Sequence, residues 1–192
     1  NEGKLVRSLP VTLGKSEADN SVWQTPTGRF RIVEKEKNPA WHVPKSIREQ
    51  QAKEGSEVKE IVPPGDDNPL GKYALRTSIP GILIHSTNIP ASIYGYGSHG
   101  CIRVFPEQME ALFKEVKVNT VGEIIYQPVK VAVTDDSRVF LEVHRDVYKK
   151  ARDLEQDTRQ LLTEKGVADR VDWDKVREIL KKRSGLPEDI GL

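Results

Sequence analysis

The sequence predicts a mainly β domain, built as a β-sandwich or barrel-like sheet with one internal helix, and a helical C-terminal extension. Between about residues 3 and 134, apolar residues come in short runs that Gly, Pro and Asn interrupt, which is typical of many short strands. After about residue 143 the apolar residues change to helical spacing. We therefore expect a β domain over residues 1–134 and a mostly helical extension over 135–192 that packs on it.

Six apolar runs are expected to form the strands of the first domain, because β-branched residues are frequent in them and turn residues bound them. They are residues 4–13, 29–34, 72–76, 81–85, 122–126 and 129–133. Asn1-Glu2-Gly3 looks like the end of a hairpin turn, so the first strand of the domain is expected to be missing from the chain. The internal helix is predicted after Pro106, where four apolar residues follow helical spacing: Met109, Leu112, Phe113 and Val116.

Two helices are predicted in the extension. One apolar stripe on an otherwise charged segment indicates the first: Val147, Ala151, Leu154, Leu161 and Leu162. The second is expected over 173–183, with Asp172 as its N-terminal cap and Gly185 as its stop signal. Two helices are too few to form a core of their own, so we expect them to rely on the β domain.

Composition gives no support to several classes of function. The 192 residues include 30 basic and 29 acidic side chains, and a net charge of +1 gives no argument for binding nucleic acid. No apolar run approaches the roughly 20 residues of a membrane-spanning helix. The chain begins at Asn1 rather than Met, so the lack of a signal peptide carries no information about export. A single cysteine cannot form an internal disulfide.

That cysteine, Cys101, lies in the segment Ser98-His99-Gly100-Cys101-Ile102-Arg103, after a glycine-rich loop. A free thiol is only a few per cent thiolate at neutral pH, so a nucleophilic cysteine needs a base. His85 ends an apolar run upstream and is the expected base. No carboxylate lies near His85 in sequence, so the backbone carbonyl of Ser86 is expected to hold its tautomer. The amides of His99, Gly100 and Cys101 are expected to form an oxyanion site.

Other interpretations of these residues stay open. A lone cysteine is more often a small buried apolar residue than a nucleophile. A lone histidine on a strand is more often a core residue whose ring nitrogens are hydrogen-bonded. His99 competes with His85 as the base, although its adjacency to Cys101 limits its geometry. His42 is expected to pack in a loop rather than bind a metal, because no second ligand stands at metal spacing. The polar segment 50–68 is a candidate lid.

The motif around Cys101, together with His85, resembles the active-site signature of the bacterial L,D-transpeptidases, the YkuD-like catalytic domain. Over residues 3–133, further stretches match this family: Thr25-Pro26-Thr27-Gly28-Arg29-Phe30, Asn68-Pro69-Leu70-Gly71, Val121-Gly122-Glu123-Ile124 and Pro128-Val129-Lys130-Val131. The tail around Ser184-Gly185-Leu186-Pro187 is similar to an extension in the branch related to ErfK and YbiS. Ser86 stands where glycine is frequent in the family, and Arg103 where some members have asparagine.

The resemblance implies a peptidoglycan L,D-transpeptidase without metal or organic cofactor. Cys101 would attack the L-to-D bond after the third residue of a stem tetrapeptide and release D-alanine. The thioester would pass to an amine of another stem, giving a 3→3 cross-link, or of a wall-anchored protein. The resemblance also implies roles for the neighbouring residues: His85 as base, Ser86 orienting it, His99 and Gly100 at the oxyanion site, and Arg103, Ser98, Tyr96 and Trp41 at the substrate.

Several of these expectations have alternatives. Ser98 either contacts substrate or supports the loop, and Arg103 either binds a substrate carboxylate or forms an internal ion pair. Tyr96 and Trp41 either border the substrate or only pack. Water in place of the amine would make the protein an L,D-carboxypeptidase. A general Cys–His peptidase or amidase, and a non-catalytic wall-binding domain, are alternatives from other classes. The family works in the cell envelope, so a periplasmic or envelope location is expected by resemblance.

Overall fold

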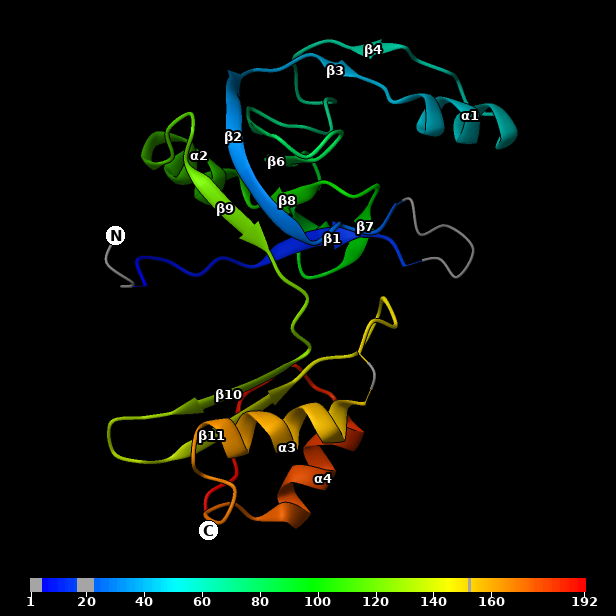
Figure 1. The fold of residues 1–192 in the computed structure, drawn as a ribbon. Helices are drawn as coiled ribbons and strands as arrows, with labels where there is room; N and C mark the ends of the chain where they lie inside the picture. Colours follow the sequence, from blue (N-terminus) through cyan, green and yellow to red (C-terminus); the bar gives the residue numbers. More distant parts are fainter. Residues whose placement is uncertain (1–4, 17–22, 152) are drawn as a thin grey trace. The chain divides into compact units, whose positions relative to one another are not determined.

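The computed structural model describes residues 5–16, 23–151 and 153–192, which fall into two compact units that meet between Ile124 and Ile125 (Figure 1). This boundary lies before the one expected at residue 134. The reason is that β10 (Val129–Val133) pairs along its whole length with β11 (Val139–Val143) and places Val129 and Val131 in the core of the second unit. The predicted strand 129–133 is confirmed, but it belongs to the second unit.

The first unit is built on one mixed sheet of seven strands, which confirms the mainly β fold class. The strand order is β7 (Tyr96–Ser98), β1 (Val11–Gly14), β8 (Ile102–Val104), β6 (Leu83–His85), β5 (Tyr73–Thr77), β2 (Gly28–Lys37) and β9 (Val121–Ile124). Two neighbouring pairs are parallel, β1 with β7 and β6 with β8. The long strand β2 pairs with β9 through its first half and with β5 through its second half.

The N-terminal strand is shorter than predicted. It begins at Val11 rather than near residue 4, because Pro10 has no N–H to donate to the ladder. The preceding Leu5 and Val6 are exposed instead of packed. The hairpin expected at residues 1–3 lies outside the described residues. Strands β7 and β8, which flank Cys101, were not predicted because three residues are too few to show alternation.

The helix predicted after Pro106 is confirmed as α2 (Pro106–Glu115), with Pro106 in its first turn, where a missing N–H costs nothing. Met109 on α2 is fully buried between the helix and one face of the sheet. That face forms the core of the unit, in which the fully buried residues are Ile32, Leu75, Val104 and Met109. The opposite face is therefore free to carry a site.

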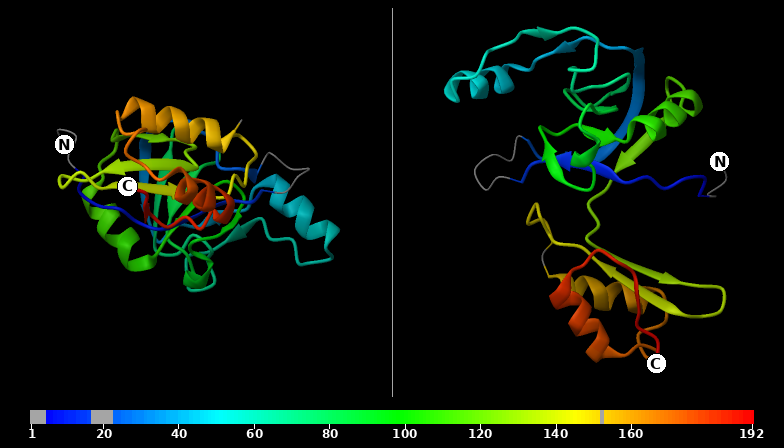
Figure 2. Two further views of the ribbon diagram at one scale, coloured as in Figure 1. Left: turned by 90° about the horizontal axis from the view of Figure 1, so that it is seen from below. Right: turned by 180° about the vertical axis from the view of Figure 1, so that it is seen from behind.

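A second helix in this unit, α1 (Lys45–Lys53), was not predicted, and it extends away from the sheet in both views of Figure 2. It lacks an apolar stripe and buries no residue, so no periodic signal marks it in the sequence. It follows β3 (Trp41–His42), which pairs with β4 (Ile61–Val62) in a separate two-stranded sheet. A short 3-10 turn at Pro90–Ser92 completes the unit.

The second unit has its own core, so the expectation that its helices depend on the β domain for a core is wrong. Helices α3 (Leu154–Glu164) and α4 (Trp173–Lys182) pack against the hairpin of β10 and β11 (Figure 2), to which β12 (Glu188–Asp189) adds a third strand. The sheet supplies the second layer that the sequence interpretation omitted. The most deeply buried members of this core are Leu141, Val143, Leu162, Val176 and Ile190.

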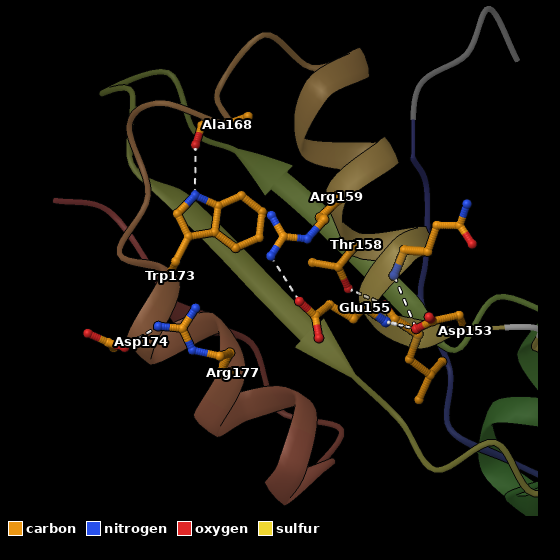
Figure 3. Close-up of polar contacts among 10 residues, drawn as sticks. Asp153, Glu155, Thr158, Arg159, Ala168, Trp173, Asp174 and Arg177 are labelled. Carbon is orange, nitrogen blue, oxygen red and sulfur yellow. Dashed lines mark hydrogen bonds and ion pairs between the residues drawn. The ribbon is translucent and has the colours of Figure 1, made fainter.

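The helix boundaries in this unit follow from their caps. Asp153 accepts hydrogen bonds from the amides of Glu155 and Gln156, so α3 starts after the predicted stripe residues Val147 and Ala151. The predicted cap Asp172 is confirmed at the start of α4. Figure 3 shows the Arg159 guanidinium over the Trp173 ring, 4.3 Å from its centroid, which joins the two helices. Within the described residues no helix is long and apolar enough to cross a membrane.

Candidate active site

The strand register brings Cys101 and His85 to the same face of the sheet, opposite to α2. In the parallel pair, Ile84 lies beside Ile102 and His85 beside Arg103. Ile84 belongs to the core around α2, so the alternation of a strand turns His85 and Arg103 to the other face. Cys101 directly precedes β8, two residues before Arg103, and shares that face. The backbone pairing of β6 with β8 therefore puts the predicted nucleophile and base on one face of the sheet, at adjacent strands.

The Cys101 thiol is half-buried and contacts two backbone groups of residues 81–83, at the start of β6. Sγ donates to the Gly81 carbonyl at 3.4 Å and accepts from the Leu83 amide at 3.4 Å. Burial raises the pKa of the thiol, against which the Leu83 amide and the guanidinium groups of Arg103 and Arg76 act. The resting form at neutral pH is thus a protonated thiol, which would need a base to act as a nucleophile.

His85 is buried, with 3% of its surface exposed, and has the tautomer that a base requires. Its Nδ1 lies 2.5 Å from the carbonyl oxygen of Ser86. A carbonyl only accepts, so Nδ1 carries the proton and Nε2 of the neutral ring has a lone pair. Burial, followed by the nearby Arg103 guanidinium, lowers the pKa of His85 to about 4, although hydrogen bonds to the Ser86 and Leu70 backbone oppose the shift. His85 is therefore neutral at pH 7.

The loop before Cys101 is held by buried hydroxyl groups. Ser98 is 1% exposed; its Oγ donates to the Cys101 carbonyl at 2.5 Å and accepts from the Gly100 amide at 3.2 Å. This geometry favours loop support over substrate contact for Ser98. It also occupies the Gly100 amide, one of the expected oxyanion donors, in this structure. Gly100 has φ +107°, which only glycine adopts readily, and an added Cβ would lie 3.0 Å from Ile82 Cδ1.

The His99 side chain points to partners on other elements. Nε2 lies 3.0 Å from Oε1 of Gln50 on α1, and the ring stacks edge-on with Trp23 at 4.6 Å between centroids. These contacts occupy the His99 ring with Gln50 and Trp23, and its role as an alternative base stays a prediction. Gln50, which sequence reasoning did not single out, begins the segment considered a candidate lid. The role of that segment as a lid stays a prediction.

The remaining predicted residues differ in their placement. Tyr96 is 42% exposed on β7, beside Leu13 of β1. Trp41 is half-buried on β3, in the separate two-stranded sheet, so the seven-stranded sheet does not carry it. Arg103 is half-buried next to His85, and its Nε is shielded from solvent without a hydrogen-bond partner. Among the described residues no carboxylate pairs with Arg103, which favours the substrate-binding alternative over the internal ion pair.

Sequence reasoning also missed Arg76 and Thr25. Arg76 on β5 pairs in register with Leu83, whose amide bonds Cys101 Sγ, and its side chain forms ion pairs with Glu34 and Glu36. Thr25 is buried in the stretch that matched the family, and its hydroxyl joins the loop to β1. No periodic pattern marks either residue: strand pairing identifies Arg76, and the hydrogen bonds of its hydroxyl identify Thr25.

Thr25→Val is expected to loosen the Cys101 loop. The Thr25 hydroxyl donates to the Gly100 carbonyl at 3.0 Å and accepts from the Gly14 amide at 2.9 Å. Valine keeps the shape but leaves both buried backbone groups without this partner, at a cost of about 1–3 kcal/mol. Denaturant unfolding and the rate of Cys101 acylation should both show the loss. Thr27→Val, at an exposed site two residues on, should show neither, and equal effects of the two variants would contradict the assignment.

Comparison with known proteins places this arrangement in a family. Residues 1–131 match the YkuD family, described as the L,D-transpeptidase catalytic domain. The "Probable L,D-transpeptidase ErfK/SrfK" of Salmonella typhimurium is 35% identical over 96% of this chain and 60% of its own length. The "Probable L,D-transpeptidase YbiS" of Escherichia coli K12 is 31% identical over 93% of this chain and 59% of its own.

The chain thus spans about three fifths of the length of these curated relatives. Among solved structures, the ertapenem-acylated catalytic domain of the E. faecium L,D-transpeptidase aligns over 65% of this chain and 84% of that one, with 22% identity and a TM-score of 0.47. The family match covers the whole seven-stranded sheet, and with it Cys101, His85 and Ser86. This chain belongs to the L,D-transpeptidase catalytic domain family.

Proposed function

We propose that this chain is the catalytic part of a peptidoglycan L,D-transpeptidase, in which Cys101 is the nucleophile and His85 the base. The observation that carries the proposal is the neutral pair on one sheet face. A protonated thiol precedes β8, and a buried imidazole on β6 has its Nδ1 proton fixed on the Ser86 carbonyl. Because the pKa of the thiol is raised and that of the imidazole is lowered, the pair rests neutral, so the proton would move during the attack rather than before it.

The first half of the reaction forms a thioester. His85 Nε2 takes the thiol proton as Cys101 Sγ attacks the carbonyl of the third stem residue, and the C–N bond to D-alanine breaks. The same proton passes from His85 to the leaving amine, so D-alanine departs neutral at nitrogen and His85 returns to its resting form. The amides of His99 and Cys101, with that of Gly100 once Ser98 releases it, stabilise the oxyanion.

Arg103 is the residue we assign to the donor peptide. A guanidinium whose Nε is shielded without a partner stays desolvated at a cost until an anion arrives, and a planar carboxylate matches its geometry. Arg103 lies beside His85 in the strand register, which supports a carboxylate bound there being close to the bond that breaks. Tyr96 and Trp41 are proposed to border the peptide further from the thiol.

The second half of the reaction transfers the acyl group to an amine of another stem peptide or of a wall-anchored protein. Water as the acceptor would give an L,D-carboxypeptidase. Because peptidoglycan lies outside the cytoplasmic membrane, we propose that the protein acts in the periplasm or cell envelope, in cell wall organisation and the maintenance of cell shape. We also propose that a carbapenem acylates Cys101.

The proposal is tested by incubating the protein with a purified tetrapeptide muropeptide and analysing the products by mass. A dimer that has lost one D-alanine indicates transpeptidation, and a tripeptide monomer indicates hydrolysis. Neither product, together with no thioester on Cys101, would overturn the assignment. Cleavage of ordinary peptides without a D-centre would instead favour a general Cys–His peptidase.

A further inference from the structure

The stretch Asn68-Pro69-Leu70-Gly71, one of those that resemble the family, has no role in the proposed reaction. Asn68 is fully buried, with 0% of its surface exposed, and it lies in the turn that leads into β5. A buried carboxamide is costly unless its oxygen and its N–H groups have hydrogen-bond partners. The partners of Asn68 therefore show which segments of the chain this residue holds together.

The amide nitrogen of Asn68 closes the base of a long excursion between β2 and β5. This excursion, residues 39–63 and here called the arm, contains β3, α1 and β4 and lies outside the seven-stranded sheet (Figure 1). Asn68 Nδ2 donates to backbone carbonyls at both ends of the arm, at 2.9 Å to Pro39, 3.2 Å to Val62 and 3.1 Å to Pro63. One side chain thus joins the start of the arm to its end.

The amide oxygen of Asn68 faces the segment that leads to the base. Oδ1 accepts from the Leu70 amide at 2.9 Å, and the Asn68 carbonyl accepts from the Gly71 amide at 3.0 Å. The Leu70 backbone is in turn hydrogen-bonded to the His85 ring. Asn68 is therefore bound to the arm on one side and, on the other, to the backbone that contacts the imidazole.

Gly71 packs against the residue that orients the base. Its φ is +63°, and an added Cβ would lie 2.8 Å from both Cβ and Oγ of Ser86, so only glycine fits this position. The Ser86 amide donates to the Tyr73 carbonyl at 2.9 Å, and the Ser86 carbonyl lies 2.5 Å from His85 Nδ1. The turn of residues 68–71 thus contacts both the imidazole and the residue that fixes its tautomer.

We propose that Asn68 is a positioning residue for the base: it keeps the turn of residues 68–71 packed against His85. This inference rests on the proposed function. Because Asn68 is fully buried, it acts on the reaction through the backbone of this turn rather than by contact with the substrate. Its hydrogen bonds to the arm keep the carboxamide in place, and its hydrogen bond to Leu70 passes that restraint to the turn.

The pKa of His85 reports on this packing. Burial is the largest cause of its lowered value of about 4, and the turn is part of what buries the ring. If the turn loosens, water reaches the imidazole and the pKa rises toward the ordinary value of about 6.5. Loss of the Leu70 hydrogen bond acts in the opposite direction, but it is the smallest cause. Among the described residues, Arg103 on β8 is the charged group that lowers this pKa, and β8 pairs with β6 whether or not the turn is intact.

Three variants separate positioning from a general loss of stability. Asn68→Ala removes every contact of the side chain. Asn68→Ser keeps a weaker bond within the turn, because a serine hydroxyl accepts from the amide two residues on, but it is too short to hold the arm as the carboxamide does. Met109→Ala is the control, because Met109 is also fully buried but packs under α2, on the opposite face of the sheet.

The measurements are made on the whole chain. Denaturant unfolding gives the stability of each variant. NMR titration of the imidazole C–H signals gives the pKa of His85, and His85→Gln identifies its signal. The rate of D-alanine release from a tetrapeptide muropeptide gives kcat, KM and the acid limb of kcat/KM.

Asn68→Ala is expected to lower kcat by about 10–100-fold with KM nearly unchanged, because a catalytic group is misplaced while substrate contacts remain. The pKa of His85 and the acid limb should both move from about 4 toward 6.5. Asn68→Ser should lose stability through the arm but recover most of the rate and of the low pKa. Met109→Ala should lose stability through the cavity that it leaves, with kcat and the pKa of His85 unchanged.

Equal effects of Asn68→Ala and Met109→Ala on the pKa of His85 would mean that any loss of stability exposes the ring, and would overturn this inference alone. Wild-type kcat and pKa in Asn68→Ala, or an Asn68→Ser variant as impaired as Asn68→Ala, would do the same. If Asn68→Ala does not fold, Gly71→Ala replaces it, because the added Cβ pushes the same turn off His85; wild-type kcat and pKa there would also overturn the inference. Absence of D-alanine release and of a thioester in the wild type would overturn the proposed function and this inference with it.

Discussion

Replacing Cys101 with alanine is expected to abolish release of D-alanine from a stem tetrapeptide, with a loss of at least about 10⁴-fold. Cys101 is the only cysteine in the chain, and in the proposed mechanism its thiol forms the thioester, so no other side chain can take its place. Intact-protein mass should show no carbapenem adduct on the variant. Unfolding should stay close to that of the wild type, because alanine removes only a half-buried sulfur whose hydrogen bonds are long.

Cys101→Ser sharpens this result, because a hydroxyl keeps the shape and the backbone contacts but is far harder to deprotonate. It is expected to be nearly as inactive as the alanine variant. The wild-type thiol should also react slowly with iodoacetamide at pH 7 and faster as pH rises, because burial keeps its pKa raised. Fast alkylation at neutral pH, or activity of Cys101→Ala within tenfold of the wild type, would contradict the proposed role.

The sequence predicts those parts of the site in which the interacting residues are adjacent in the sequence. Ser86 follows His85 directly, so its carbonyl was the available partner for Nδ1, and the structure has this contact. Gly100 precedes Cys101 and takes the positive φ that the tight loop needs. The strands predicted around 72–76 and 81–85 are present as β5 and β6 because their apolar residues alternate or cluster clearly.

The parts that the sequence does not predict depend on pairing between distant segments. Arg76 comes near the Cys101 thiol only because β5 pairs with β6 and β6 pairs with β8. A β-bulge at Val33 in β2 is a backbone irregularity without a residue signature, yet it decides which face Glu34 occupies. Helix α1 buries no side chain and so has no pattern to detect. The sheet of the second unit is not predicted for a related reason, because β11 lies inside the extension that the sequence indicates to be mostly helical.

Replacing His85 with glutamine is expected to slow thioester formation by about 10²–10⁴-fold, the usual contribution of a general base. The pH dependence distinguishes this role from a purely structural one. Because the pKa of His85 is lowered to about 4, the wild-type kcat/KM should be flat through neutral pH and fall only as pH approaches 4. A thiolate–imidazolium pair would place the acid limb at the low pKa of the thiol and hold the histidine pKa high. An acid limb near 6.5 would contradict the lowered pKa of His85.

The same pKa makes folding depend on pH. The unfolded chain binds a proton on His85 below about 6.5, whereas the folded protein binds it only below about 4, so the unfolded state takes up more protons in this window. Stability contributed by neutral His85 is therefore complete above pH 6.5 and lost as pH falls through 4, by about 3 kcal/mol. Denaturant unfolding of the wild type at several pH values should show this slope, and His85→Gln should lack it. A substitution of Ser86 cannot test its contact with His85, because the contact uses the backbone carbonyl of Ser86. The pH dependence of the His85 variants is therefore the direct test of the environment at the end of β6.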